Sequence, residues 1–344
     1  MFLLLTELYE VKNMKRILMI ATGGTIASKS SAHGLHPALT SEDLLLSVPE
    51  VSDICEVDTI QLMNLDSTDI TPADWLQMAD TIEKNYHKYD SFVITHGTDT
   101  MAYTAAALSY LIQNSPKAIV LTGAQKSISL SNTDARSNLI DSFLYASDDL
   151  SHGVTIVFNG KVILGTRARK ERTRSYNAFS SVDYPEVAVI RERKIIRFLQ
   201  TDMNPSSKPV FYHFIDPSVL VITLIPGISG AAIRNLKNDY HALVIQSFGV
   251  GGLPGGGKGE LACALNEWVK ADKPVILTTQ VPYEGGDLST YQVGAEIKEL
   301  YPVIEAHDMT LEAITAKLMW ALTSTKKPQE IERLFSIPIN HDIL

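Results

Sequence analysis

Residues 17–26 read ILMIATGGTI: an unbroken apolar run, ILMIA, is followed by a threonine, two glycines, a second threonine and an isoleucine. Continuous apolar runs are typical of strands buried on both faces, and such strands form parallel sheets. The remaining short runs along the chain have the same character: Phe92–Thr95, Ala118–Thr122, Val154–Phe158, Val219–Leu224, Leu243–Ser247 and Val275–Thr278. We therefore expect a buried parallel sheet.

Helical patterns lie between these runs. Thr71 followed by Pro72 is a helix N-cap with proline in the first turn. Apolar residues then recur at helical spacing in three stretches: Trp75, Met78, Ala79, Ile82 and Tyr86; Met101, Ala105, Leu108, Leu111 and Ile112; and Leu311, Ile314 and Leu318. Strands that alternate with helices indicate right-handed βαβ units, so the predicted fold class is α/β.

The alternation lapses between about residues 176 and 217, where Asn204–Pro209 and Asp216-Pro217 are rich in turn formers. We predict an N-terminal α/β domain over residues 15–203, a linker over 204–217 and a smaller α/β domain over 218–344. Residues 1–14 are expected to be a disordered extension, with Met14 as the natural start. The opening MFLLLTELYE lacks the basic start and the small-residue cleavage site of a signal peptide.

The composition excludes several classes of protein. The 344 residues carry 30 Lys and Arg against 39 Asp and Glu, and this net charge of −9 without a basic run argues against a nucleic-acid partner. No apolar run approaches the roughly 18 residues of a membrane span. Two cysteines, Cys55 and Cys263, are too few for a disulfide framework or a four-cysteine zinc site. We expect two packed thiols in a cytoplasmic protein.

The candidate site lies where the strands end, because ligands of open parallel sheets bind beyond the carboxyl ends of the strands. Small, hydroxyl-bearing and acidic residues gather there in four segments: Thr22–Ile26, Asp66–Asp69, Thr95–Thr100 and Thr122–Gln125. Paired glycines let the backbone approach a ligand closely. These features favour a small polar zwitterion over a nucleotide.

A threonine hydroxyl is a nucleophile only when another group removes its proton. A lysine amine can take that proton, and a carboxylate can hold the lysine in place. Thr98 and Asp99 supply a hydroxyl and a carboxylate, and Lys170 is the candidate base. Asp99 can also attract a substrate ammonium, and N–H groups at the following helix start can receive an anionic oxygen.

The segments Thr22–Ile26 and His96–Thr100 together resemble the paired signatures of the bacterial asparaginase/glutaminase family, in its cytoplasmic type I branch. The resemblance runs from about Lys15 to Leu322 and includes Pro226–Ile228, Ser247–Gly249 and Thr278–Gln280. It implies a flavodoxin-like N-terminal domain, a smaller C-terminal domain and a homotetramer of intimate dimers. It also implies an L-asparaginase that needs no cofactor and no metal, with L-asparagine and L-aspartate as its ligands.

The resemblance also implies roles for individual residues. Thr25 matches the nucleophile, and Thr98, Asp99 and Lys170 match a second catalytic set that activates water. Asp99 also matches the group that grips the α-ammonium. Ser67 matches the hydroxyl that holds the α-carboxylate, with Asp66 and Thr68 beside it as further substrate contacts; many relatives have glutamine at position 68.

One position departs from the family pattern. Relatives usually carry a tyrosine on the mobile loop about ten residues after the nucleophile, whereas Leu35 stands here. Leucine cannot take a proton. Either another group replaces the phenol, with His33, His36 and Tyr176 as candidates, or Lys170 acts through Thr98 in both steps.

Other signals are weaker. Gly252–Lys258 has the glycine and lysine spacing of a phosphate-binding loop, but Gly259 replaces the required Ser or Thr, so we expect a C-terminal-domain loop instead. His33 and His36 lack a third metal ligand and are expected to be surface residues. His96 ends a buried strand and is expected to be a hydrogen-bonded structural histidine.

Three functions remain open on the sequence alone. Asparagine hydrolysis leads, and glutamine is the first alternative because one methylene gives only about 1–3 kcal/mol of discrimination. Archaeal glutaminase subunits of tRNA-dependent amidotransferases share the motifs but typically carry an extra N-terminal domain, and only 21 residues precede Thr22. The third is a non-catalytic amino-acid sensor, which would not need Thr25, Thr98 and Lys170 together.

Overall fold

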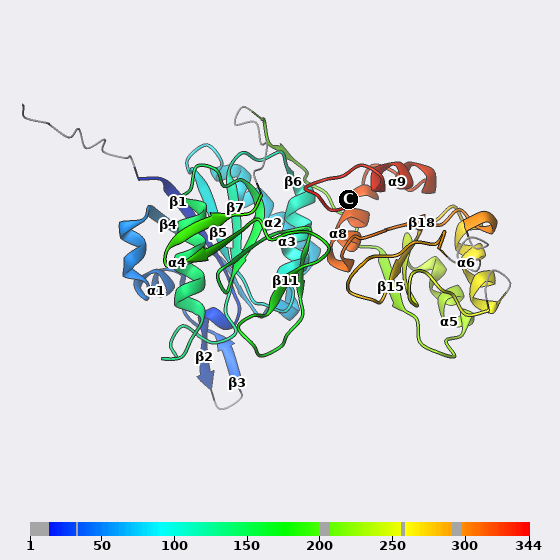
Figure 1. The fold of residues 1–344 in the computed structure, drawn as a ribbon, viewed down its shortest axis with the longest axis horizontal. Coiled ribbons are helices and arrows are strands. Elements are labelled where there is room, and N and C mark those ends of the chain that lie inside the picture. Colours follow the sequence, from blue (N-terminus) through cyan, green and yellow to red (C-terminus); the bar gives the residue numbers. More distant parts are fainter. Residues whose placement is uncertain (1–13, 32–33, 200–206, 256–258, 291–297) are drawn as a thin grey trace, which may run out of the picture.

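The computed structural model describes residues 14–31, 34–199, 207–255, 259–290 and 298–344, and for residues 29–31 and 34–37 only the backbone is described. The expected extension over 1–14 therefore lies almost entirely outside the described residues. The two ends of the molecule in Figure 1 are two α/β lobes, a larger N-terminal one and a smaller C-terminal one.

The larger lobe is built on an eight-stranded sheet. Five parallel strands form most of it in the order β4-β1-β5-β7-β8, and three antiparallel strands extend it as β9-β12-β13. Counted along the chain, the parallel strands run second, first, third, fourth, fifth, which is the flavodoxin-like order. The strands are β1 (Arg16–Gly23), β4 (Glu56–Leu65), β5 (Ser91–Thr95), β7 (Ala118–Thr122), β8 (Gly153–Phe158), β9 (Lys161–Leu164), β12 (Ala188–Arg191) and β13 (Lys194–Arg197).

Helices cover both faces of this sheet because successive residues of its central strands are buried on opposite sides. Leu18, Ile20 and Ile94 face α2 (Pro72–Asn85) and α3 (Met101–Leu111), whereas Met19 and Val93 face α1 (Ser41–Leu46) and α4 (Ala135–Ala146). Figure 1 shows these helices on the two sides of the strands. The continuous apolar runs are explained by this double burial.

The smaller lobe has four parallel strands in chain order: β15 (Val219–Thr223), β16 (Ala242–Ser247), β17 (Val275–Thr279) and β18 (Ile304–Glu305). Helices α5 (Gly230–Asn235) and α6 (Glu260–Lys270) pack on one face of this sheet. Helix α8 (Leu311–Ala321) lies between its other face and helix α3 of the larger lobe, so one hydrophobic core continues through both lobes.

Further short elements are β2 (Ser28–Ser31), β3 (Gly34–Pro37), β6 (Ile112–Gln113), β10 (Ala168–Lys170), β11 (Phe179–Ser181), β14 (Val210–Phe211), α9 (Pro328–Phe335), and the 3-10 turns η1 (Thr25–Ala27), η2 (Pro49–Asp53), η3 (Ser67–Asp69) and η4 (Leu236–Asn238). Among the described residues, no helix has both the length and the apolar character to cross a membrane.

All seven apolar runs are strands, and the three helical patterns are α2, α3 and α8, so the predicted α/β class is confirmed. The runs omit β4, because this strand lies at the sheet edge and alternates between exposed and half-buried residues. At the start of α2, the Thr71 backbone N–H donates to Asp74 Oδ2 at 2.7 Å and Pro72 occupies the first turn, as the sequence predicts.

Candidate active site

The loops that follow β1, β4 and β5 are in backbone contact because glycine stands at each meeting point. A Cβ on Gly24, where φ is 80°, would lie 2.4 Å from the N and Cα atoms of Gly97. A Cβ on Gly97 would lie 2.6 Å from Ser67 Oγ, and one on Gly23 would lie 2.4 Å from the Leu65 oxygen. Any side chain at these positions would therefore push the three loops apart.

The two threonines of interest directly follow the touching glycines. Thr25 follows Gly24 at the start of η1 and is half-buried, and Thr98 follows Gly97 just before α3 and is buried. The structure thus brings both threonines to one edge of the sheet, between β1 and β5. The strand order reverses between β1 and β5, because the chain passes from β1 outward to β4 and then back to the other side of β1 to form β5. Such a switch point is where flavodoxin-like folds bind their ligands.

Lys170 reaches this edge from β10. Its Nζ atom donates to Thr98 Oγ1 at 2.7 Å and to Asp99 Oδ1 at 2.5 Å. The Lys170 side chain is only 14% exposed, whereas the Asp99 side chain is 61% exposed. An ammonium at this position donates to both oxygens, and a neutral amine can instead accept the Thr98 proton. Asp99 keeps enough exposed surface to meet a second cation.

Gln125 is a further member of the site that sequence reasoning places only within a strand-end segment. Its Oε1 accepts from Thr98 Oγ1 at 3.3 Å, and its Nε2 donates to the carbonyl oxygens of Arg172 and Ser175 at 3.3 and 3.1 Å. The backbone N–H of Gln125 is fixed by Asp134 Oδ2 at 2.9 Å. An amide has no acid–base chemistry of its own, so only the fold shows that Gln125 ties Thr98 to the loop after β10.

Ser67, Thr68 and Asp66 form the turn η3 beside these groups. Asp66 Oδ1 accepts from the backbone N–H of Thr68 at 2.9 Å and from its hydroxyl at 2.8 Å, so this carboxylate caps the turn. The Ser67 carbonyl accepts from Thr100 Oγ1 at 2.7 Å, and the Ser67 side chain is buried against Gly97. The turn is therefore attached to the loop that carries Thr98.

His96 is a structural histidine, as the sequence predicts. The side chain is 0% exposed; Nδ1 lies 2.7 Å from the Gly97 oxygen and Nε2 lies 3.0 Å from Thr104 Oγ1. Trp75 Nε1 in turn donates to Thr104 Oγ1 at 3.0 Å. Burial lowers the pKa of His96 to about 4. A neutral imidazole thus donates to the Gly97 carbonyl and accepts from Thr104.

The candidate replacements for the missing loop tyrosine are described only in part. Leu35 pairs with Ser30 in the β2–β3 ribbon, but the side chains of Leu35 and His36 and all of His33 lie outside the described residues. The Tyr176 hydroxyl donates to the Asn132 carbonyl, so this phenol is held by the neighbouring loop.

The cysteines differ from each other. Cys55 is buried, and burial raises the pKa of its thiol to about 11, so it is a packed and unreactive thiol, as the sequence predicts. The same prediction for Cys263 is wrong. Cys263 is exposed on α6 because its neighbours Leu261 and Leu265 take the buried face of that helix.

The glycine-rich segment after β16 forms a turn. The N–H of Gly252 donates to the Phe248 carbonyl at 2.7 Å, and Lys258 lies outside the described residues.

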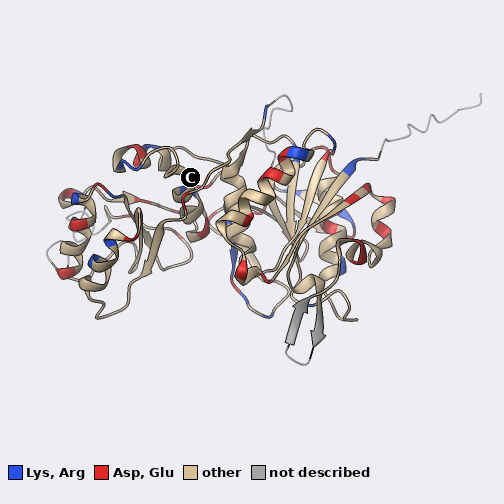
Figure 2. Cartoon of the chain, turned by 180° about the vertical axis from the view of Figure 1, so that it is seen from behind, with Lys and Arg blue, Asp and Glu red and all other residues tan. Residues whose placement is uncertain are grey.

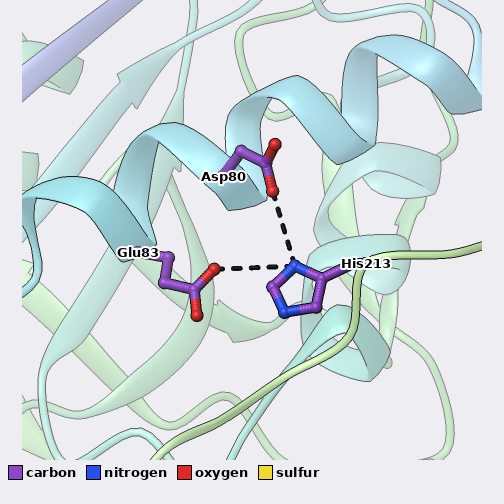
Figure 3. A group of neighbouring side chains, drawn as sticks. All are labelled: Asp80, Glu83 and His213. Carbon is purple, nitrogen blue, oxygen red and sulfur yellow. Dashed lines mark ion pairs between the residues drawn. The ribbon is translucent and has the colours of Figure 1, made fainter.

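A second polar cluster joins helix α2 to the segment before β15. Figure 3 shows His213 facing Asp80 and Glu83, with Nδ1 3.6 Å from one oxygen of each carboxylate. Within the described part of the chain, these three residues alone offer ligand atoms within 4.8 Å of one another for a metal ion. About half of the His213 side chain is exposed, and both carboxylates are also partly exposed, so the three side chains form a polar cluster that faces solvent.

Comparison with known families agrees with this geometry. Residues 16–203 match the family described as "Asparaginase, N-terminal", and residues 218–335 match the "Glutaminase/Asparaginase C-terminal domain". The chain belongs to the asparaginase family. The resemblance inferred from the strand-end motifs is therefore confirmed.

Several relatives align over nearly all of the chain. An L-asparaginase of Thermococcus kodakarensis is 37% identical over 329 residues, covering 95% of this chain and 99% of the relative. A solved structure described as the thermostable L-asparaginase from that organism superposes with a TM-score of 0.88 at 36% identity, covering 96% and 99% of the two chains. A glutamyl-tRNA(Gln) amidotransferase subunit from Pyrococcus abyssi is 32% identical over 334 residues, covering 93% of this chain and 75% of the relative.

The glycine contact can be tested by one pair of substitutions. Gly24 and Gly153 both have positive φ, but a Cβ on Gly153 would meet nothing within 4 Å. We expect Gly153→Ala to lower the free energy of unfolding by about 1–2 kcal/mol through its backbone conformation alone. Gly24→Ala should cost at least about 2 kcal/mol more, because its Cβ also collides with Gly97. Equal losses in urea denaturation would contradict the close contact.

His96 should make stability depend on pH. Its pKa is about 4 in the folded chain and 6.5 for an unperturbed histidine, so the unfolded chain binds more protons between these values. The contribution of this group is therefore complete above pH 6.5 and should fall by about 3 kcal/mol toward pH 4. His96→Gln should remove that share of the decline. Parallel wild-type and His96→Gln stability profiles over this range would refute the assignment.

Proposed function

We propose that this asparaginase-family protein hydrolyses L-asparagine to L-aspartate and ammonia by double displacement, with Thr25 as the nucleophile. The observation that carries the proposal is the hydrogen-bonded set of Lys170, Thr98 and Asp99 beside the loop of Thr25. A pair of hydroxyls with an amine is more than amino-acid binding alone needs, which disfavours the non-catalytic sensor.

In the first half-reaction, Thr25 Oγ1 bonds to the side-chain amide carbon of asparagine. The tetrahedral intermediate then collapses as the C–N bond breaks, and the nitrogen leaves as ammonia with a proton from the site. An acyl ester on Thr25 remains. The proton of Thr25 can be accepted in one of two ways. Either one of His33, His36 and Tyr176 accepts it, or Lys170 accepts it through Thr98.

In the second half-reaction, water attacks the ester carbon. Thr98 accepts a proton from this water and passes its own to the neutral amine of Lys170, which is 2.7 Å away. The ester C–O bond then breaks, Thr25 recovers a proton, and aspartate is released. Asp99 holds the Lys170 amine in the orientation needed for this transfer.

The charged α-ammonium and α-carboxylate groups of the substrate determine which residues bind it. The largely exposed Asp99 carboxylate grips the α-ammonium, and the hydroxyl of Ser67 holds the α-carboxylate. We expect Thr68 to contact the substrate beside Ser67, and Asp66 to contribute mainly by fixing the turn through its bonds to Thr68. We further propose a homotetramer that works in the cytoplasm, where the free Cys55 and Cys263 remain reduced.

Two related activities compete with this proposal. Glutamine is one methylene longer than asparagine, a difference worth only about 1–3 kcal/mol in a pocket. The 32% identity to an amidotransferase subunit makes delivery of ammonia to a partner the other alternative.

The substrate is tested by ammonia release from asparagine and from glutamine, each over a concentration series with the isolated protein. We expect kcat/KM for asparagine to exceed that for glutamine by about tenfold or more. The reverse order would make the protein a glutaminase, and no ammonia from either amide would reject the proposed function.

The catalytic roles are tested by Thr25→Ala, Thr98→Ala and Lys170→Met, with Thr81→Ala on the outer side of α2 as the matched control. Each site variant should lower kcat for asparagine by about a thousandfold or more, because nucleophile and base act as one unit. Thr81→Ala should retain wild-type kinetics. Full activity in both Thr25→Ala and Thr98→Ala would overturn the assignment.

Leu35 should shape the loop without taking part in proton transfer, because its side chain cannot accept a proton. We expect Leu35→Ala to change KM more than kcat and to lose far less kcat than Thr25→Ala. A comparable loss of kcat in the two variants would contradict this expectation.

A further inference from the structure

The strand that carries Lys170 does not belong to the large sheet. Among the described strands, β10 pairs only with the three-residue strand β11, in the register Lys170 with Phe179. The backbone ladder that aligns β1 and β5, and with them both threonines, therefore does not extend to Lys170. Other contacts must hold the lysine within reach of Thr98.

Arg167, the residue before β10, makes such contacts across the molecule. Its side chain is 0% exposed, and its guanidinium donates to Asp308 Oδ2 at 2.8 Å, to the Asp308 carbonyl at 3.1 Å and to the carbonyl of His341. The Nη2 atom has no partner among the described residues. A buried guanidinium is costly without partners, so Arg167 depends on Asp308 and on the C-terminal segment.

The C-terminal segment, residues 336–344, is itself fixed by a buried ion pair. Asp342 Oδ2 lies 2.8 Å from Lys317 Nζ on α8 and accepts from the Tyr110 hydroxyl on α3 at 2.8 Å. The side chains of Lys317 and Asp342 are both 0% exposed. Burial raises the pKa of Tyr110 well above its usual value, so its hydroxyl remains a donor to Asp342.

A neighbouring residue of the segment reinforces this attachment. Asn340 Nδ2 donates to the Ser109 carbonyl at 2.8 Å, and the Asn340 carbonyl accepts from Thr166 Oγ1 at 2.7 Å. Thr166 is thus tied to the segment just before Arg167. Both residues that lead into β10 are held by the last residues of the chain, which lie beyond the matched C-terminal domain ending at residue 335.

We propose that Arg167 and the C-terminal segment are positioning elements that hold the Lys170 amine at Thr98 and Asp99. This inference rests on the proposed function, since it assigns the segment a role in setting the geometry of the proposed base. A purely structural segment would contribute to stability and leave the chemistry of the Lys170 amine unchanged in every folded variant.

The test compares Arg167→Met and Arg167→Lys with Arg333→Met, which removes an exposed arginine on α9 that pairs with Glu330. Kinetics with asparagine over pH are measured for each folded variant. In parallel, the rate at which acetic anhydride acetylates Lys170 is followed over pH by mass spectrometry, which requires no substrate turnover.

We expect Arg167→Met to lower kcat about ten- to a hundredfold with KM changed less than about threefold, because a small displacement of a catalytic group has effects of this size. Its kcat–pH profile and the pH midpoint of Lys170 acetylation should shift together. Arg167→Lys should recover part of kcat, and Arg333→Met should match the wild type in both readouts.

A folded Arg167→Met with wild-type kcat, pH profile and acetylation of Lys170 would overturn the proposal. If Arg167→Met does not fold, the proposal is tested with Arg167→Lys and with Asp308→Asn, which keeps the shape of the Asp308 side chain. Wild-type kcat, pH profile and Lys170 acetylation in both of these variants would also overturn it. A wild-type protein that releases no ammonia would instead reject the proposed function, and the acetylation measurement would still decide the positioning role.

Discussion

The backbone contact between Gly24 and Gly97 is the constraint on which the candidate site depends. Two neighbouring parallel strands end at the same edge of the sheet, but their loops meet only because neither glycine has a Cβ. The next residue in each loop is a threonine. Both hydroxyl-bearing residues are thereby placed by backbone geometry, which is stiffer than the conformation of a long side chain. The buried His96 supports the same contact through its hydrogen bond to the Gly97 carbonyl.

The third group of the site is held differently. Lys170 approaches from a two-stranded ribbon, and its support comes from Arg167, from the lobe junction and from the C-terminal segment. Helix α8 packs on α3 within a hydrophobic core that both lobes share, so the smaller lobe is part of the support for the site. Figure 2, seen from behind, shows that acidic and basic residues are distributed over the ribbons of both lobes.

The sequence predicts what depends on local pattern and leaves out what depends on long-range contacts. Doubly buried strands are continuous apolar runs and are therefore recognisable, whereas the half-exposed edge strand β4 alternates and is not. The sequence names Thr98, Asp99 and Lys170 as one candidate set, and in the structure Lys170 Nζ donates to both of the other two side chains. Gln125 contacts Thr98, 27 positions away in the chain, and Arg167 contacts His341, 174 positions away. A local sequence pattern cannot predict such contacts. Cys263 shows that an apolar residue type does not by itself mean burial.

A crystal structure with aspartate bound would decide whether both threonines act on the same carbon. We expect the side-chain carboxylate of aspartate within about 3 Å of both Thr25 Oγ1 and Thr98 Oγ1, with the α-ammonium on Asp99. Aspartate bound with its side chain turned away from both hydroxyls, or with Lys170 withdrawn from Thr98 in that complex, would contradict the proposed mechanism.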